Sequence, residues 1–176
     1  MKTFGTILLF ALFAATSLFA QDTIPRFKKI PVQNSGCYLY APDTMQFDLS
    51  YSDDSSAVYT GEWIIGDHRF AAIVVDLNNV TFESKEEKED LLMSYMDFLQ
   101  SSFEITDAAG YGKGHTLESD PTAAGVIDFW IDASADEWAV KGWINDDFIA
   151  VLMIYGPGQY PHYSIQEMYL NGIRFK

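Results

Sequence analysis

A long amphipathic helix, set among segments that alternate like β-strands, is the feature that most constrains how this chain can fold. Apolar residues recur at spacings of three and four from Leu91 to Phe103, as in a helix that lays one face on a sheet. Ser84 and Glu87 form a capping box ahead of that run, because the hydroxyl and the carboxylate can each accept a free backbone N–H. We therefore expect a helix over residues 85–103.

Strand-like segments lie on both sides of this helix. The segment 45–51 alternates apolar and polar residues, which is the pattern of a half-buried strand. The other segments are rich in β-branched and aromatic residues. We expect strands over residues 37–40, 45–51, 58–65, 69–77, 125–133, 138–144 and 148–155, and over the residues up to Leu117 that follow a glycine turn at 110–114.

Turn residues indicate how several of these segments connect. Residues 66–67 (Gly-Asp) predict a tight hairpin, and residues 145–147 (Asn-Asp-Asp) predict another. Ser164 and Glu167 form a second capping box, which predicts a short helix that Gly172 ends. Strands joined by hairpins, with helices in separate blocks, are typical of the α+β class. We expect an antiparallel β-sheet of about six to seven strands with helices packed on it.

Residues 1–20 carry the pattern of a secretory signal peptide. Lys2 precedes an apolar run over residues 7–15, small residues follow up to Ala20, and the chain turns polar at Gln21. The apolar run is too short for a membrane anchor. We expect a signal peptide at residues 1–20, export to the periplasm or the cell exterior, and no membrane span after signal cleavage.

Residues 21–36 form an expected N-terminal leader, ahead of a single α+β domain at residues 37–176. The leader holds two prolines and a cluster of three cations at Arg26, Lys28 and Lys29. These features fit either a docking arm or a frayed terminal segment, and we expect the frayed segment.

The formal net charge of −14 excludes several classes of partner. With 25 acidic against 11 basic residues, the protein repels phosphate backbones and anionic lipids. We therefore expect no nucleic-acid partner. Such acidity is compatible with cation binding, with a basic partner or with plain solubility. Cys37 is the one cysteine, so no internal disulfide can form, and we expect a small buried side chain there.

The order of the segments resembles the PsbP/Mog1-like superfamily. The residues that carry the resemblance are Tyr-Ala-Pro-Asp at 40–43, the hairpin at 141–152, and the closing helix with its tail Tyr-Leu-Asn-Gly-Ile-Arg-Phe at 169–175. The resemblance covers about residues 37–176 and implies an α/β/α sandwich, as in the lumenal extrinsic proteins of photosystem II and many secreted bacterial domains. It implies binding or accessory work and supplies no catalytic residue.

No local motif in the sequence nominates a catalytic residue or a metal ligand. His68, His115 and His162 each fall in or beside a turn and form no His-x-x-x-His pair. The loop at 110–114 departs from a phosphate-binding loop, and the aspartate pairs lack the alternation that wraps calcium. We expect no cofactor and no metal, and a catalytic site only if distant residues assemble one.

Aromatic residues are the remaining candidates for a ligand site. Trp138 lies on an expected strand, and Tyr155, Tyr160 and Tyr163 surround the Gly-Pro-Gly loop after the last strand. Aromatic side chains that share a cleft make a good ligand or partner surface. Our first hypothesis is a secreted, non-enzymatic binding or accessory domain for a protein or a small-molecule ligand. A secreted hydrolase with a site assembled in space, and an acidic cation-binding protein, are the alternatives.

Overall fold

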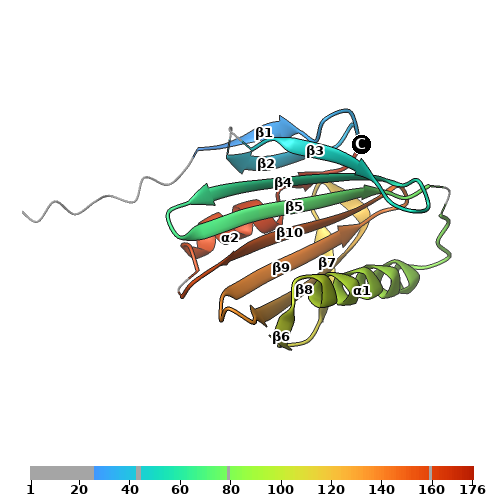
Figure 1. Ribbon diagram of the computed structural model, residues 1–176. Coiled ribbons are helices and arrows are strands. Elements are labelled where there is room, and N and C mark those ends of the chain that lie inside the picture. The colour runs from blue at the N-terminus through green and yellow to red at the C-terminus, as the bar shows by residue number, and fades with distance from the viewer. Residues whose placement is uncertain (1–25, 43–44, 79, 159) are drawn as a thin grey trace, which may run out of the picture.

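The computed structural model describes residues 26–42, 45–78, 80–158 and 160–176. The expected signal peptide and the first part of the expected leader lie outside the described residues. The elements in chain order are β1 (Phe27–Pro31), β2 (Tyr38–Pro42), β3 (Phe47–Tyr51), β4 (Ala57–Ile65), β5 (His68–Asp76), α1 (Lys85–Ser102), β6 (Ile105–Ala108), β7 (Gly112–Leu117), β8 (Asp120–Asp132), β9 (Glu137–Ile144), β10 (Phe148–Gly156), α2 (Tyr163–Leu170) and β11 (Ile173–Arg174) (Figure 1). The described chain is therefore of the mixed α+β class, as the sequence predicts.

Eight strands form one antiparallel main sheet, which is more than the six to seven that the sequence predicts. Its order is β3-β4-β5-β10-β9-β8-β6, and β7 also pairs with β8. The additional strand is β6, which has four residues and is mostly exposed. A short edge strand with one exposed and one partly covered side gives no regular burial alternation, so its sequence does not predict it.

Both predicted hairpins are present in the main sheet. Ile65 pairs with His68 across the β4–β5 turn, where Gly66 adopts a φ of +57°, a conformation that glycine tolerates without steric cost. In the β9–β10 turn, the N–H of Asn145 donates to the carbonyl of Phe148 at 3.0 Å. The two turns place β4, β5, β9 and β10 at the centre of the sheet.

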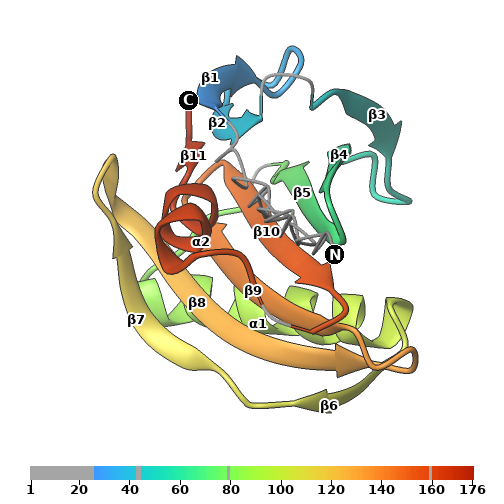
Figure 2. The same cartoon turned by 90° about the vertical axis from the view of Figure 1, so that its left-hand side faces the viewer.

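The main sheet is covered differently on its two faces (Figure 2). Helix α1 packs on β8, β9 and β6, and we call this side the α1 face. Helix α2 packs on β10 and on β2, on the side that we call the α2 face. A second, three-stranded sheet of order β1-β2-β11 lies beside α2.

The predicted long helix is confirmed as α1, with nearly the predicted bounds. The Ser84 hydroxyl accepts the N–H of Glu87 at 3.2 Å, and the Glu87 carboxylate accepts the N–H of Glu83 at 2.8 Å. The sheet makes room for the helix at Gly142, where a Cβ atom would lie 2.7 Å from Cδ1 of Leu92. A larger residue at this position would displace the helix.

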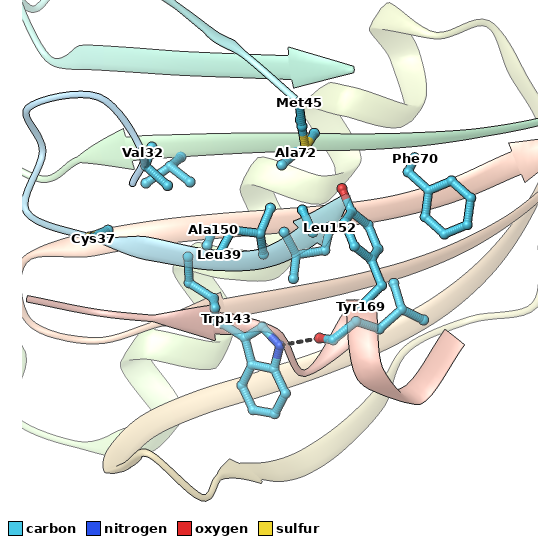
Figure 3. Close-up of a cluster of buried hydrophobic side chains, with 14 of the residues drawn as sticks. Val32, Cys37, Leu39, Met45, Phe70, Ala72, Trp143, Ala150, Leu152 and Tyr169 are labelled. Carbon is cyan, nitrogen blue, oxygen red and sulfur yellow. Dashed lines mark hydrogen bonds between the residues drawn. The ribbon is translucent and has the colours of Figure 1, made fainter. Parts of the chain in front are cut away.

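The α2 face holds a core that joins the small sheet to the main one (Figure 3). The indole Nε1 of Trp143 donates to the carbonyl of Leu170 at 2.7 Å, which fixes the end of α2 on β9. Tyr169 packs edge-on against Phe70, with ring centroids 5.2 Å apart. Leu39 of β2 is fully buried in the same cluster.

The expectation of a frayed leader is wrong from Phe27 onward. This part of the leader forms β1, which pairs with β2 along its whole length. Val32, directly after the strand, is fully buried, and Phe27 and Ile30 pack against the α2-face core. Apolar residues among and after the cations supply the burial that holds the segment in place. Cys37 is 1% exposed, so the expected buried side chain is confirmed.

The predicted start of the second helix is wrong by two residues. Ser164 is not the N-cap; His162 is, and its Nδ1 accepts the N–H of Ser164 at 3.3 Å. The helix therefore begins at Tyr163, before the residue at which the capping-box pattern starts. An imidazole nitrogen can cap a helix because it offers the same lone pair that a hydroxyl would.

Candidate functional site

The α1 face of the main sheet is covered over only part of its width. Helix α1 lies over β8 and β9, and the same face of β3, β4, β5 and β10 stands beside it (Figure 1). A groove of about 640 Å³ occupies this open half. It is the larger of two hollows described below, and ligand sites commonly form in concavities of this size.

Small side chains form the floor of the groove, and large aromatic ones form one of its walls. Ala71 and Thr60 lie on neighbouring strands in the middle of the floor. The lining residues are Gln46 and Asp48 ahead of and on β3, Thr60, Gly61 and Glu62 on β4, Ala71, Ala72 and Ile73 on β5, Phe103 after α1, Trp138 on β9, and Met153 and Tyr155 on β10. Five strands and the end of one helix therefore build the site.

A stack of three aromatic rings forms the wall on the helix side. Trp138 and Tyr155 are paired across β9 and β10, and their rings stack 3.8 Å apart at an interplanar angle of 4°. Phe103 stacks near Trp138 at 5.3 Å. The indole Nε1 donates to Oδ2 of Asp132 at 3.1 Å, so the buried polar atom of the stack has a partner. The stack is rigid and apolar.

Helix α1 carries two further aromatic residues, Tyr95 and Phe98, outside the groove lining. Lys88 forms a 2.8 Å ion pair with Asp146 in the β9–β10 turn, which turns that flank of the helix towards β10. Tyr95 lies two turns further along the same flank, and burial raises its pKa to about 12. Phe98 is 60% exposed, with its ring 6.0 Å from that of Tyr95. Phe98 is thus an exposed apolar side chain of the helix.

Carboxylates mark the side of the groove away from the helix. Oε1 of Glu62 accepts a 2.5 Å hydrogen bond from the Tyr155 hydroxyl and lies 3.3 Å from Nη1 of Arg69. Burial, followed by this hydrogen bond to Glu62, raises the pKa of Tyr155. Asp48 on β3 adds a second carboxylate. The described lining residues include no lysine, arginine, histidine or cysteine, so the charged groups of the lining are carboxylates alone.

The four residues that the sequence nominates do not form one site. Trp138 and Tyr155 meet in the groove wall, as described above. Tyr160 lies beside Phe129, with ring centroids 6.3 Å apart, in a separate hollow of about 200 Å³ next to β6 and β8. Burial and then the charge of Glu137 raise its pKa to about 12. Tyr163 is 69% exposed on α2.

Sequence reasoning nominates two of the groove's lining residues and misses the rest, among them the aromatic Phe103 and the carboxylates of Glu62 and Asp48. Phe103 was assigned to the helix face, whereas Glu62 and Asp48 occupy strand positions with ordinary alternation. The signal that could have found them is the hairpin register, which places Glu62 opposite Ala71 and therefore on the side of the sheet that also carries Tyr155. That inference needs the strand order, which spacing along the chain does not supply.

The three histidines lie outside this groove. His68 begins β5 and His162 caps α2. His115, on β7, is partly buried, and burial together with nearby Lys141 lowers its pKa. Among the residues that the structure describes, no three or more histidine, cysteine or acidic side chains converge to hold a metal ion. The groove can therefore bind through apolar contact and through attraction to positive charge.

Comparisons with known proteins supply no evidence on what the groove binds. No protein-family model matches the chain, and no curated protein matches it. Within the described part of the chain, neither helix combines the length and the apolar character that crossing a membrane requires.

Proposed function

We propose that this protein is an exported, non-enzymatic binding or accessory domain whose ligand carries a cationic group on an apolar body. The observation that carries the proposal is the groove, in which the stacked rings of Trp138 and Tyr155 stand next to the carboxylate of Glu62. An apolar wall with a few placed polar groups is the usual composition of a ligand site.

The charges select the ligand class. The described lining residues contribute two carboxylates, from Asp48 and Glu62, and no basic side chain. Arg69, which is outside the lining, forms an ion pair with Glu62 at 3.3 Å. The Glu62 carboxylate is therefore placed to interact with a cation. A ligand cation adds its own attraction to the rings, worth roughly 0.5–2 kcal/mol where it faces a ring.

The proposal extends to fold family and address. An α/β/α sandwich of the PsbP/Mog1-like kind is supported by the two helices, which pack on opposite faces of one antiparallel sheet. Export rests on the signal-peptide pattern of residues 1–20. Binding work suits this combination, because the groove needs neither a cofactor nor a covalent step to hold its ligand.

The test uses 2-phenylethylammonium as the cationic probe and 2-phenylethanol as its uncharged counterpart, titrated by two-dimensional amide NMR. We expect the cation to shift amides of β4, β5 and β10 and to bind more tightly than the alcohol. The double variant Asp48→Asn with Glu62→Gln should lower the affinity for the cation by about fivefold, because each exposed charge pair contributes well under 1 kcal/mol to binding.

Glu118→Gln is the matched control, because Glu118 is an exposed carboxylate in the β7–β8 turn, outside the groove lining. This variant should bind the probe as the parent protein does. Equal affinity of the parent and the double variant, or shifts that cluster away from the groove, would overturn the proposal.

A further inference from the structure

Basic residues gather on the small sheet of an otherwise acidic molecule. Residues 26–42 and 171–176, which build β1, β2 and β11, hold no acidic residue, and their cations are Arg26, Lys28, Lys29, Arg174 and Lys176. Of the 25 acidic residues, all but Asp22 and Asp43 lie between residues 45 and 170. Although the net charge is −14, the small sheet is therefore basic and the rest of the described chain is acidic.

The outer face of this sheet combines the cations with tyrosines. Nζ of Lys29 lies 4.2 Å from the ring centre of Tyr38, and the guanidinium of Arg174 lies 5.0 Å from that of Tyr40. Lys29 and Tyr38 are both exposed. On this face, the positive charges of Lys29 and Arg174 are therefore positioned over tyrosine rings.

Protection of an edge strand explains only part of this arrangement. Lysines and a proline on β1 would discourage pairing with apolar strands of other proteins. Arg174 and Lys176 lie on or after β11, at the other side of the sheet, and edge protection of β1 does not require them. The same lysines favour a strand that carries carboxylates.

We propose that the outer face and the β1 edge of the three-stranded sheet dock an extended, acidic polypeptide segment of a partner protein. Among the described residues β1 pairs with β2 alone, so its other edge can accept a partner strand through main-chain hydrogen bonds. Lys29 lies on β1 opposite Tyr40 and is exposed, so it places a cation next to such a strand. The proposal does not rest on the groove, which lies on the α1 face.

The partner is narrow, because the basic sheet is small. Its strands have five, five and two residues, so it offers little area to a flat anionic surface such as a bilayer. A single extended segment can contact the cations alone, within the short range of screened charge.

The test measures binding of a capped peptide of alternating Glu and Thr by calorimetry, with Gln/Thr and Lys/Thr peptides of equal length as controls. We expect only the acidic peptide to bind, with amide shifts in β1 and β2, and to bind at least about fivefold more weakly at about 150 mM than at about 20 mM salt. Lys29→Gln should weaken it by about threefold, and Arg174→Gln should weaken it less, because Arg174 lies on the strand farthest from the β1 edge.

Lys113→Gln is the matched control, because Lys113 is a half-exposed lysine of β7 that pairs with Asp90. Arg174 donates to the carbonyls of Asn171 and Ile173. Lys29→Gln leaves these two hydrogen bonds in place, so this variant keeps the fold intact even if Arg174→Gln does not. Equal binding of the acidic and neutral peptides, or an unchanged affinity in Lys29→Gln, would refute the proposal. The proposal would also be refuted if the protein bound phosphatidylglycerol vesicles, or associated with itself, in place of the acidic peptide, and if Lys29→Gln weakened that binding.

Discussion

The hydroxyl of Tyr155 on β10 donates a 2.5 Å hydrogen bond to Oε1 of Glu62 on β4, across the intervening strand β5. The two residues are far apart in sequence, and β5 passes between them with its small Ala71. The bond joins the aromatic wall of the groove to its acidic side. Arg69 contacts the same oxygen, so one carboxylate organises that end of the site.

Tyr155→Phe should lower the free energy of unfolding by about 0.5–1 kcal/mol, because it removes this hydrogen bond and keeps the ring stacked on Trp138. The value lies at the low end of the range because Glu62 is 43% exposed and water can replace the lost donor. Chemical denaturation measures the change. Tyr51→Phe, at a ring that is 69% exposed, should change stability by less than about 0.5 kcal/mol. A loss above about 3 kcal/mol would mean that the ring itself has moved.

Lys141 and Asn171 should be energetically coupled. The Lys141 side chain is buried in the main sheet, donates to Oδ1 of Asn171 at 2.8 Å, and has its pKa lowered by that burial. Asn171→Leu should cost about 1–3 kcal/mol, because it leaves the buried ammonium without its acceptor. Lys141→Met should cost less, since an apolar side chain of similar length needs no partner.

The double variant separates this coupling from simple loss of packing. Denaturation of Lys141→Met with Asn171→Leu should show a smaller loss than the sum of the single variants, because the unpaired charge is gone. Strict additivity would indicate that the two side chains do not depend on each other.

Tyr95 should make the protein less stable as the pH rises above about 10. Its folded pKa is about 12, whereas an unfolded tyrosine ionises near 10. The folded state therefore keeps the proton that the unfolded state loses, and the free energy of unfolding falls between pH 10 and 12. Denaturation at a series of pH values, with tyrosinate absorbance as a second readout, measures this. Tyr95→Phe should make the decline shallower, and an unchanged slope would contradict the assignment.

The local elements could be predicted because their signals lie within a few residues. The capping box of Ser84 and the apolar spacing that follows define α1, and the turns at 66–67 and 145–147 define two hairpins. The signals fail where burial comes from distant segments. β1 is held by core residues contributed by other strands and α2, and β6 is too short and too exposed to show a pattern.

The sequence nominates Trp138 as an aromatic residue of an expected strand and Tyr155 as one beside the Gly-Pro-Gly loop, and the structure pairs the two across β9 and β10. Their separation from Tyr160 and Tyr163 was decided by the loop after β10, which carries the chain from the β10 strand to the α2 face.

By itself the sequence determined the α+β class, the long helix, the hairpins and the net acidity, because propensity, periodicity and charge are properties of the chain. Only the tertiary structure decided that α1 leaves half of a sheet face open, that Phe103 and Glu62 share a groove, and that the basic residues of both chain ends lie on one sheet. These are matters of strand order and helix placement. They follow from the packing of the whole molecule, in which α1 covers only the strands that its apolar face contacts.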